Sequence, residues 1–499
     1  MNTPIPDSRV YEFCLPKVDV PVQAAEADRA ASICASRGTL TGWRISRLLW
    51  IKDTLPDAMR ARHGQWGAES GERERPSFRC WSSDVEISVK SPLAAEAFHA
   101  MPLAEQVHFL RTWNPGTPSW DGPMREGLAA ILQAEVKAQP VHFFENAGQF
   151  TGLDPVYSSA LVRGFSERLA GRAVADWEPF WTFARWILAQ PDPEAEIQDD
   201  FTGQAQRGRR WQSCRLELAR FLDATLNGEL APLPLTERAS VWQLIDALIR
   251  DPNPAPADEA REDQRGIDPF TLSLNTVRGE AVHAVFSFIR WVRSRPPNAA
   301  QGGQNLDDVP EARAALEARL DPQQEPTRTV RSVIGANLAR LAFWAETWLG
   351  DHLRQVFPAQ GQIELRETAW DTFIRCSRAN GKTFALLRRQ YFAAIARMSP
   401  DRLGEHRHHD GQVRLGQNLV ENYGCGHLDF EQPGNLLAAF FARAPEQVRA
   451  EVVAFVGRSL TQSDQRIPPE ILVRLLKLWN WQAQFETAPG GPGYQDRVA

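Results

Sequence analysis

The chain has 499 residues, which is too long for one compact core, so we expect two or three domains or one extended array. A hydrophobic fraction of 43%, a charged fraction of 24% and a net charge of −6 are typical of a globular protein and exclude a strong overall attraction to nucleic acid. No apolar run is long enough to cross a bilayer, and residues 2–7 lack the basic and apolar regions of a signal peptide, so we expect a cytoplasmic location and no membrane partner.

The first part of the chain divides into two predicted regions. Residues 1–90 predict an N-terminal helical segment with a polar loop, and the best strand candidate of the whole chain is 85–89, which has no obvious partner strand. Residues 91–260 predict a helical-repeat region. Helix starts are indicated where an aspartate precedes a proline, at Asp154-Pro155 and at Asp176 ahead of Pro179, because the aspartate caps the helix and the proline fits its first turn.

Residues 261–488 predict a second helical-repeat region, followed by a disordered tail over 489–499. Apolar residues at helical spacing predict four long helices here, over 277–292, 330–348, 448–460 and 471–485. Asp308, shortly before Pro310, predicts a further helix cap. The polar stretches 252–266 and 296–308 are expected to be surface loops or linkers.

Helices of this length in pairs predict an all-α fold, an irregular α-solenoid of stacked antiparallel helix pairs of the broad HEAT or TPR kind. The sequence shows no strict repeat period, so an irregular multi-helix domain is the competing fold. The 17 tryptophans, among them Trp177, Trp181 and Trp348, are expected to fill the core between helices, with an aromatic platform for bases as the alternative.

Motifs of catalysis and cofactor binding are absent from the sequence. Gly381-Lys382-Thr383 is similar to the end of a phosphate-binding loop, but that loop needs a glycine where Cys376 stands, so we interpret Asn380-Gly381 as a turn between two helices. Nucleophile elbows, zinc-protease helices and dinucleotide fingerprints are also missing. We therefore expect no enzyme activity and no cofactor.

Two residue clusters have binding chemistry of another kind. His406, His408 and His409, with Cys425 downstream, are candidate metal ligands, and the helix predicted between them either brings the two groups together or holds them apart. Arg207, Arg209 and Arg210 beside Trp211 form the strongest basic cluster, which suits a nucleic-acid phosphate or a protein partner. For each cluster a solvated surface is the simpler interpretation.

Several phrases of the sequence resemble the helical C-terminal regions of large bacterial ATP-binding proteins of the NACHT or STAND type, many of which are linked to defence against phage. The phrases are Ser91-Pro92-Leu93, Arg125-Glu126-Gly127-Leu128, Gly152-Leu153-Asp154-Pro155-Val156-Tyr157, Leu161-Val162-Arg163-Gly164, Asp176-Trp177-Glu178, Asn275-Thr276-Val277-Arg278-Gly279-Glu280-Ala281, Gly426-His427-Leu428 and Phe455-Val456-Gly457-Arg458-Ser459-Leu460. They span roughly residues 90–485, most of the chain.

The resemblance implies a helical sensor or scaffold region that follows an ATPase module. No such module is present in the sequence, so ATP hydrolysis is not carried over, and the chain would be a fragment, a split-gene product or a standalone relative. The resemblance also draws attention to three residues with predicted structural roles. Asn275 is expected to cap a helix, Arg278 to bond loop carbonyls at a junction between repeats, and Gly279 to let helices approach closely.

Three functional hypotheses follow. The first is a non-enzymatic scaffold or sensor that binds a protein partner, such as a separate ATPase or effector, in bacterial antiviral defence. The second is a nucleic-acid-binding solenoid that uses the region from Arg207 to Trp211. The third is a metal-dependent enzyme built on the region of His406 and Cys425.

Overall fold

A computed structural model describes residues 90–115, 122–192, 210–294, 305–358, 361–398, 406–429, 435–461 and 467–487, together with Asp57, Arg60, Ala61, Gly64 and Gln65. Contacts between Cα atoms divide the chain into two compact units, residues 1–88 and 89–499. The fold below is that of the second unit. The strand candidate at 85–89 and the tail at 489–499 lie outside the described residues.

The described residues form helices and no β-strand, so the predicted all-α class is confirmed. In chain order the helices are α5 (Ala95–His99), α6 (Leu103–Thr112), α7 (Arg125–Ala138), α8 (Pro140–Glu145), η2 (Ala147–Phe150), α9 (Pro155–Arg168), α10 (Glu178–Leu188), α11 (Trp211–Leu226), η4 (Leu235–Glu237), α12 (Arg238–Leu248), α13 (Pro256–Gln264), α14 (Pro269–Ser273), α15 (Val277–Arg293), α16 (Pro310–Leu320), α17 (Arg328–Ala336), α18 (Leu338–Trp344), α19 (Glu346–Val356), α20 (Ile363–Cys376), α21 (Gly381–Ala396), α22 (His406–Gly424), α23 (Leu436–Arg443), α24 (Glu446–Thr461) and α25 (Pro469–Thr487).

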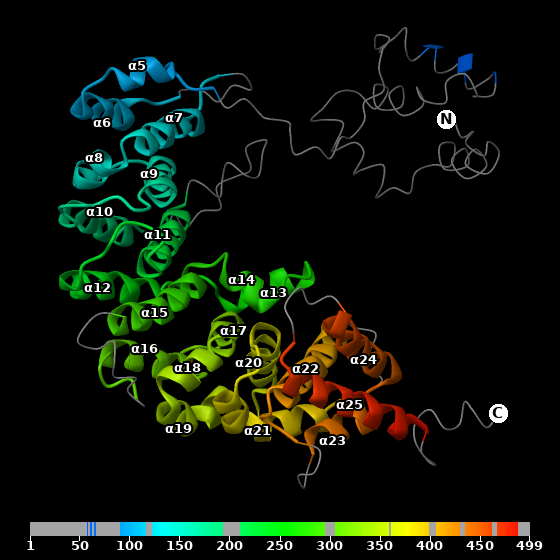
Figure 1. Cartoon of the computed structure of the whole chain (residues 1–499). Coiled ribbons are helices and arrows are strands. Elements are labelled where there is room, and N and C mark those ends of the chain that lie inside the picture. Colours follow the sequence, from blue (N-terminus) through cyan, green and yellow to red (C-terminus); the bar gives the residue numbers. More distant parts are fainter. Residues whose placement is uncertain are drawn as a thin grey trace. The chain divides into compact units, whose positions relative to one another are not determined.

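The helices pack in chain order in two rows (Figure 1). In the first row each helix packs against the next, in the order α7, α9, α11, α15, α17, α20, α22 and α24. In the second row α8 contacts α10, α10 contacts α12, α18 contacts α21 and α21 contacts α23. This order is that of helix pairs stacked in series. The irregular α-solenoid of stacked antiparallel pairs stays a prediction beside the competing irregular multi-helix domain, because the short helices α13, α14 and α18 interrupt the alternation of the rows.

The predicted helix starts are confirmed where aspartate precedes proline closely. The Asp154 carboxylate accepts a hydrogen bond from the Val156 backbone N–H at 3.0 Å, directly before Pro155 begins α9. Asp176 accepts from the Glu178 N–H at 3.0 Å. The predicted cap at Asp308 is wrong. Its carboxylate instead pairs with the Arg293 guanidinium, whose Nε lies 2.8 Å away, and Val309 precedes α16 without a side-chain cap.

The helix predicted over 330–348 is three helices, α17, α18 and α19. The chain leaves helical geometry at Asn337 and again at Ala345, where φ is −152° and ψ is 57°. Asn337 bonds back to the preceding turn, its Nδ2 donating to the Val333 carbonyl at 2.9 Å. Each break takes a single residue, so the apolar residues keep the spacing of one continuous helix on either side of it. The apolar residues that predicted the helix are all buried, namely Val330, Ile334, Leu338, Leu341, Ala345 and Trp348.

The polar stretch 252–266, predicted to be a loop, contains helix α13. Its buried Glu259 carboxylate accepts hydrogen bonds from the Arg328 N–H at 3.1 Å and the Thr329 N–H at 2.6 Å, the first residues of α17. A carboxylate at a helix N-terminus satisfies N–H groups that lack partners within the helix. At least one charged residue of this stretch, Glu259, therefore makes a buried contact between helices and is not simply exposed to solvent.

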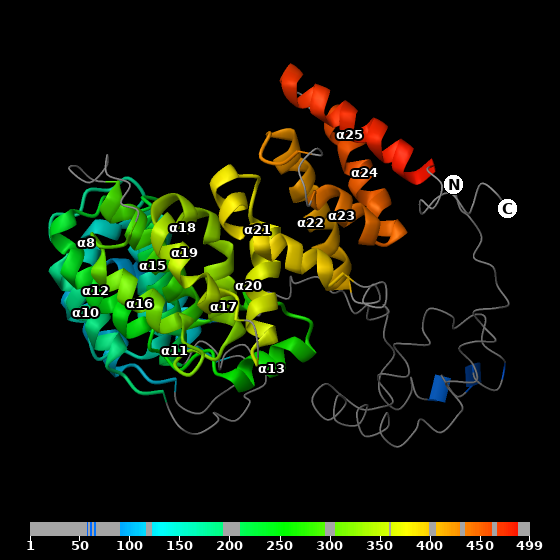
Figure 2. The ribbon, with the colours of Figure 1, turned by 90° about the horizontal axis from the view of Figure 1, so that it is seen from below.

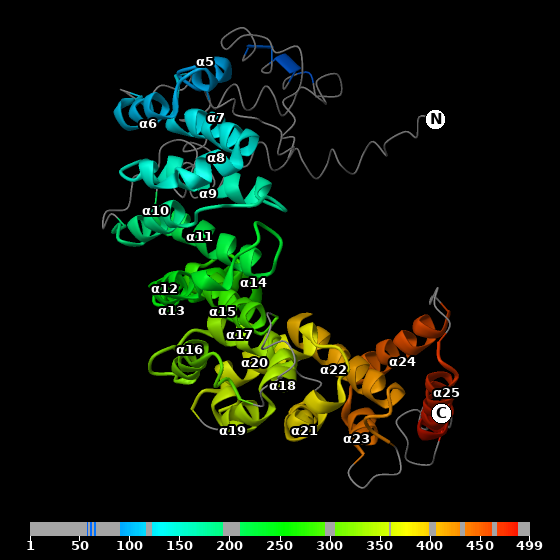
Figure 3. The ribbon, with the colours of Figure 1, turned by 60° about the vertical axis from the view of Figure 1, so that its left-hand side comes forward.

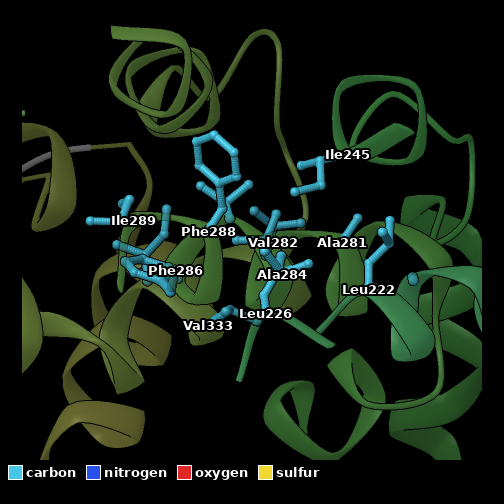
Figure 4. Packing of buried hydrophobic residues seen from close by; sticks show 14 of the residues in the cluster. Leu222, Leu226, Ile245, Ala281, Val282, Ala284, Phe286, Phe288, Ile289 and Val333 are labelled. Atoms are coloured by element: carbon cyan, nitrogen blue, oxygen red, sulfur yellow. The ribbon is translucent and has the colours of Figure 1, made fainter. Parts of the chain in front are cut away.

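The core is continuous along the rows, and the prediction that tryptophans fill it is confirmed for Trp177, Trp181 and Trp348, each at most 3% exposed. The Trp177 and Trp181 rings stack with centroids 5.4 Å apart. Figure 4 shows the packing further along, where α15 side chains from Ala281 to Ile289 pack together with Leu222 of α11 and Val333 of α17. Trp479 in α25 is an exception, at 48% exposed.

Candidate binding groove

A groove of about 1140 Å³ crosses the first-row helices α7, α9 and α11, which follow one another in Figure 3. Contacts between α9 and α11 join Ser159 to Cys214 and Arg163 to Glu217, so residue numbers rise together and the two helices run parallel. Each helix presents one face, made of positions i, i+3, i+4 and i+7, which lie on the same side of a helix. These residues are Glu126, Ala129, Ala130 and Gln133 in α7, Val156, Ser159, Ala160 and Arg163 in α9, and Ser213, Leu216, Glu217 and Arg220 in α11.

The groove is hollow because the middle positions of two helices carry small side chains. Ala129, Ala130, Ser159 and Ala160 leave the helix backbones close to the surface of the groove floor. Beneath them α7 and α9 pack tightly at Gly164, where an added Cβ would lie 2.6 Å from a Val136 methyl carbon. Small residues above and close helix packing below together shape the floor.

The opposite wall comes from a later part of the chain. It consists of the loop 252–255, helix α13 and the junction between α14 and α15. Helix α13 contributes charged side chains in pairs, with Asp258 bound to Arg261 and Glu262 to Arg265 at 2.8 Å. Asn275 and Thr276 complete the wall at the start of α15.

Ion pairs between neighbouring helices form a ladder along one edge of the groove. Lys137 of α7 pairs with Glu167 of α9. Arg163 of α9 lies 3.0 Å from Glu217 of α11, and Arg220 of α11 lies 3.4 Å from Glu280 of α15. Glu217 and Arg220 also face each other at 3.7 Å. Apart from the pair within α11, each of these ion pairs joins two neighbouring helices.

Charge in the groove is mixed. The lining contains five arginines and four acidic residues, Arg163, Arg210, Arg220, Arg261, Arg265, Glu126, Glu217, Asp258 and Glu262. Positive and negative side chains alternate over the floor and the wall, so the groove has nearly no net charge and suits a ligand that carries both signs.

Glu280, at the end of the ladder, is only 7% exposed. Burial raises the pKa of its carboxyl to about 7, the Arg220 guanidinium opposes this rise, and the carboxylates of Asp223 and Glu217 add to it. Arg220 also donates to the Leu274 carbonyl at 2.6 Å and to Asn275 Oδ1 at 3.3 Å. One guanidinium therefore connects the floor, the buried carboxyl and the far wall.

Arg278 holds the loop of the far wall from behind, as the sequence predicts. Its guanidinium donates to the Asp251 and Pro254 carbonyls, and its Nε lies 2.8 Å from the buried Glu325 carboxylate. Gly279 beside it permits the close approach that was expected, because a Cβ there would lie 2.4 Å from the Ser273 carbonyl oxygen. Arg215, whose Nε donates to Asp251 at 2.6 Å, extends this buried network to α11.

The predicted cap at Asn275 is wrong. Thr276 is the residue before α15, and the first N–H groups of that helix are satisfied by Asn253, which accepts from Val277 at 3.0 Å and from Arg278 at 2.8 Å. Asn253, from a loop distant in the sequence, therefore caps α15 in place of Asn275. Asn275 instead donates to the Thr271 carbonyl at 3.0 Å and lines the groove.

The basic cluster is described only in part. Arg207 and Arg209 lie outside the described residues. Arg210 is half-buried and lines the groove. Trp211 begins α11 and packs edge-on against Trp186, with ring centroids 5.1 Å apart, so its ring serves the packing between α10 and α11.

The candidate metal ligands are held apart. A single helix, α22, runs from His406 to Gly424, which places His406 and Cys425 about 28 Å apart along the axis. Zinc ligands must all lie within about 2.3 Å of the ion, so these residues cannot share one. Among the described residues no group of three or more His, Cys, Asp or Glu side chains is arranged to hold a metal. Of the two arrangements that the sequence left open, the helix therefore holds His406 and Cys425 apart.

The interpretation of Asn380-Gly381 as a turn is confirmed. Four residues separate α20 from α21, and the Asn380 side chain caps α21 by accepting from the Thr383 N–H at 3.1 Å.

The structure also contains a serine and histidine pair that sequence reasoning missed. Ser273 Oγ lies 3.0 Å from His283 Nε2, but it donates to the Phe270 carbonyl at 2.6 Å and is fully buried. Burial lowers the pKa of His283 to about 4, and the nearby Arg340 adds to this effect. A nucleophile needs access to substrate and a base that takes its proton, so this pair is structural.

Within the described ranges each helix is too short or too polar to cross a lipid bilayer. Comparison of the chain with known protein families, with curated proteins and with solved structures gives no match.

Proposed function

We propose that the groove over α7, α9 and α11 binds a segment of a polypeptide partner, and that the chain acts as a helical scaffold or sensor. The observation that carries the proposal is the groove itself, in which three successive helices present the same face and α13 closes the far side. Stacked helices bind partners across such faces because each pair adds one more strip of contact surface.

A polypeptide suits the groove better than a small molecule or a nucleic acid. A volume of about 1140 Å³ lies above the roughly 300–1,000 Å³ of small-molecule pockets. A phosphate backbone carries one sign of charge and would meet Glu126, Glu217, Asp258 and Glu262 along with the arginines. A polypeptide with both signs of charge can pair with either set, so the nucleic-acid alternative is the weaker one.

The resemblance to NACHT and STAND proteins extends the proposal to the biological setting. On that resemblance, the partner belongs to a bacterial antiviral defence system and is a separate ATPase or effector, or a component of the invader. This setting rests on the resemblance alone and not on the groove.

Two substitutions on α7 test the groove. Ala130 and Ala134 are both exposed alanines of the same helix, but only Ala130 lines the groove. We expect Ala130→Trp to fill the floor and weaken partner binding at least tenfold, while Ala134→Trp leaves it unchanged. The partner is identified by purification of the tagged full chain from its native host, and the affinity is then measured with both purified proteins.

The outcomes separate the hypotheses. A polypeptide that binds the wild type and the Ala134→Trp variant but not the Ala130→Trp variant supports the proposal. Equal binding to all three chains contradicts it. Salt-sensitive binding of a short DNA or RNA that is lost in Arg210→Ala would support the nucleic-acid alternative instead.

A further inference from the structure

Helix α25, the last helix described, is apolar on two faces. One face carries the buried Leu475 and Leu478, which pack toward α22 and α24 (Figure 2). The other carries four large apolar side chains that remain exposed, Leu472 at 38%, Val473 at 54%, Leu476 at 48% and Trp479 at 48%. We call these four residues the outer face of α25. A helix that is apolar on both sides is normally covered on both sides.

The spacing of the outer face indicates that its cover is another helix. Leu472, Leu476 and Trp479 follow one another at steps of four and three residues. That alternation places side chains along one straight seam, as in helices that pack side by side through interlocking residues. The helix is 19 residues long, so the seam extends along an element of about 28 Å.

The outer face has no counterpart elsewhere on the described residues. The other exposed large apolar side chains are Leu274, Phe343, Ile363 and Phe392, and each lies on a different element. A head-to-tail contact between copies would need a second apolar patch to receive α25. A contact between two copies that covers the outer face and is made by the described residues therefore uses the same face twice.

The rim of the outer face permits a second copy to approach. The exposed polar residues of α25 nearest the seam are Glu470, Lys477, Asn480 and Gln484, which carry one negative charge, one positive charge and two neutral amides. Two identical rims of this kind do not repel each other, whereas a rim of one sign would.

We propose that two copies of this chain associate about a twofold axis by packing the outer face of α25 against the same face of the other copy. A contact confined to one face of a single helix belongs to the class of small interfaces, below about 1,200 Å², and complexes of that class are weak and transient, so we expect a dissociation constant in the micromolar range. The proposal does not depend on the groove, because no residue of α25 lines it.

The test is the mass of the full chain in solution between about 1 and 100 μM, a range that brackets a micromolar constant, measured by sedimentation velocity or light scattering. We expect the wild-type mass to rise from that of one chain to that of two. The double variant Leu476→Glu with Trp479→Glu should keep the mass of one chain at every concentration. Both positions are about half exposed, so the variant should melt at the wild-type temperature by circular dichroism.

Phe343→Glu is the matched control, because Phe343 is a single exposed apolar residue on α18, and this variant should dimerise like the wild type. A wild-type mass of one chain at the highest concentration overturns the proposal, as does a dimer that persists in the double variant. Unlimited growth beyond two chains would mean a head-to-tail contact and also overturns it. So would a single-chain wild type that sediments with phosphatidylcholine vesicles when the double variant does not.

Discussion

Buried arginines join the ends of helices to one another. Arg331 is 1% exposed and donates to the Leu320 carbonyl at 3.0 Å and to the Gln355 carbonyl, in the last turns of α16 and α19. Burial lowers the pKa of Arg331 to about 10, so it stays charged at neutral pH. A guanidinium offers five N–H donors in a fixed plane and can satisfy several carbonyls at once, which the compact ammonium of lysine cannot. Only six of the 56 basic residues are lysines, and contacts such as this one give the many arginines a structural use.

The buried Glu280 carboxyl should make stability depend on pH. Its folded pKa of about 7 lies above the unfolded value of 4.5, so the folded state binds the proton more tightly. The stability it contributes is present below pH 4.5 and is lost as the pH rises through 7. We expect Glu280→Gln, which mimics the protonated form, to match the wild type at pH 4.5 and to be more stable at pH 8.5 by roughly 1–3 kcal/mol.

The measurement is urea unfolding of both chains at several pH values, and the quantity compared is the difference between them. The exposed Glu96→Gln on α5 is the control and should change stability by the same small amount throughout. A difference for Glu280→Gln that stays constant, or shrinks as the pH rises, would mean that the carboxyl is already ionised in the folded state at low pH.

Local patterns predicted helix caps correctly only where the partner is also local. Asp154 caps its own helix and was found from its position before Pro155. Asp308 stands in a similar place, but Arg293 takes its carboxylate. Asn253 caps α15 from 24 residues away, and no spacing rule indicates that contact. Long-range competition for hydrogen bonds depends on packing and does not appear in a single sequence.

Among the elements, the short helices were the hardest to predict. The apolar stripe from Val330 to Trp348 is correct as a list of buried residues and wrong as one helix, since Asn337 and Ala345 break it without disturbing the spacing. Helix α13 was missed because its sequence is almost entirely polar, although Glu259 is buried. The groove was likewise not predicted, because its floor consists of alanines and a serine that resemble ordinary helix positions.

Close packing between elements gives a prediction at Gly279. A Cβ there would meet the backbone oxygen of Ser273 at 2.4 Å, so Gly279→Ala must push α15 away from α14. Gly350 in α19 has nothing within 4 Å of its added Cβ. We expect Gly279→Ala to destabilise the fold by about 1–3 kcal/mol and Gly350→Ala to stabilise it by about 0.5–1 kcal/mol, from helix propensity. Thermal unfolding of the two variants measures these changes as a lower melting temperature for Gly279→Ala and a higher one for Gly350→Ala. Equal changes in melting temperature would contradict the packing argument.

On the scale of the whole unit, the contacts of the first row run from each helix to its neighbours. In a series of helices that contact only their neighbours, the free energy of unfolding is close to a sum of contributions from each helix and its neighbours. A substitution in one helix then destabilises mainly that helix and the helices beside it. Leu222 in α11 is fully buried and belongs to the group of packed side chains that Figure 4 shows. We expect Leu222→Ala to raise amide hydrogen exchange in α9, α11 and α15 and to leave α22, α24 and α25 unchanged, as measured by mass spectrometry. A uniform rise along the chain would indicate one cooperative core.

The loop behind the far wall of the groove has a thermodynamic consequence for the partner. Arg278, Asn253 and Glu325 hold the residues from Asp251 to Pro254 in place by hydrogen bonds and an ion pair that the chain forms within itself. A preorganised wall does not have to be ordered on association, so binding loses little conformational entropy on this side of the complex. Arg278→Lys should loosen the loop, so that the loop loses conformational entropy when the partner binds. The affinity for the partner would then fall, although no residue that lines the groove has changed.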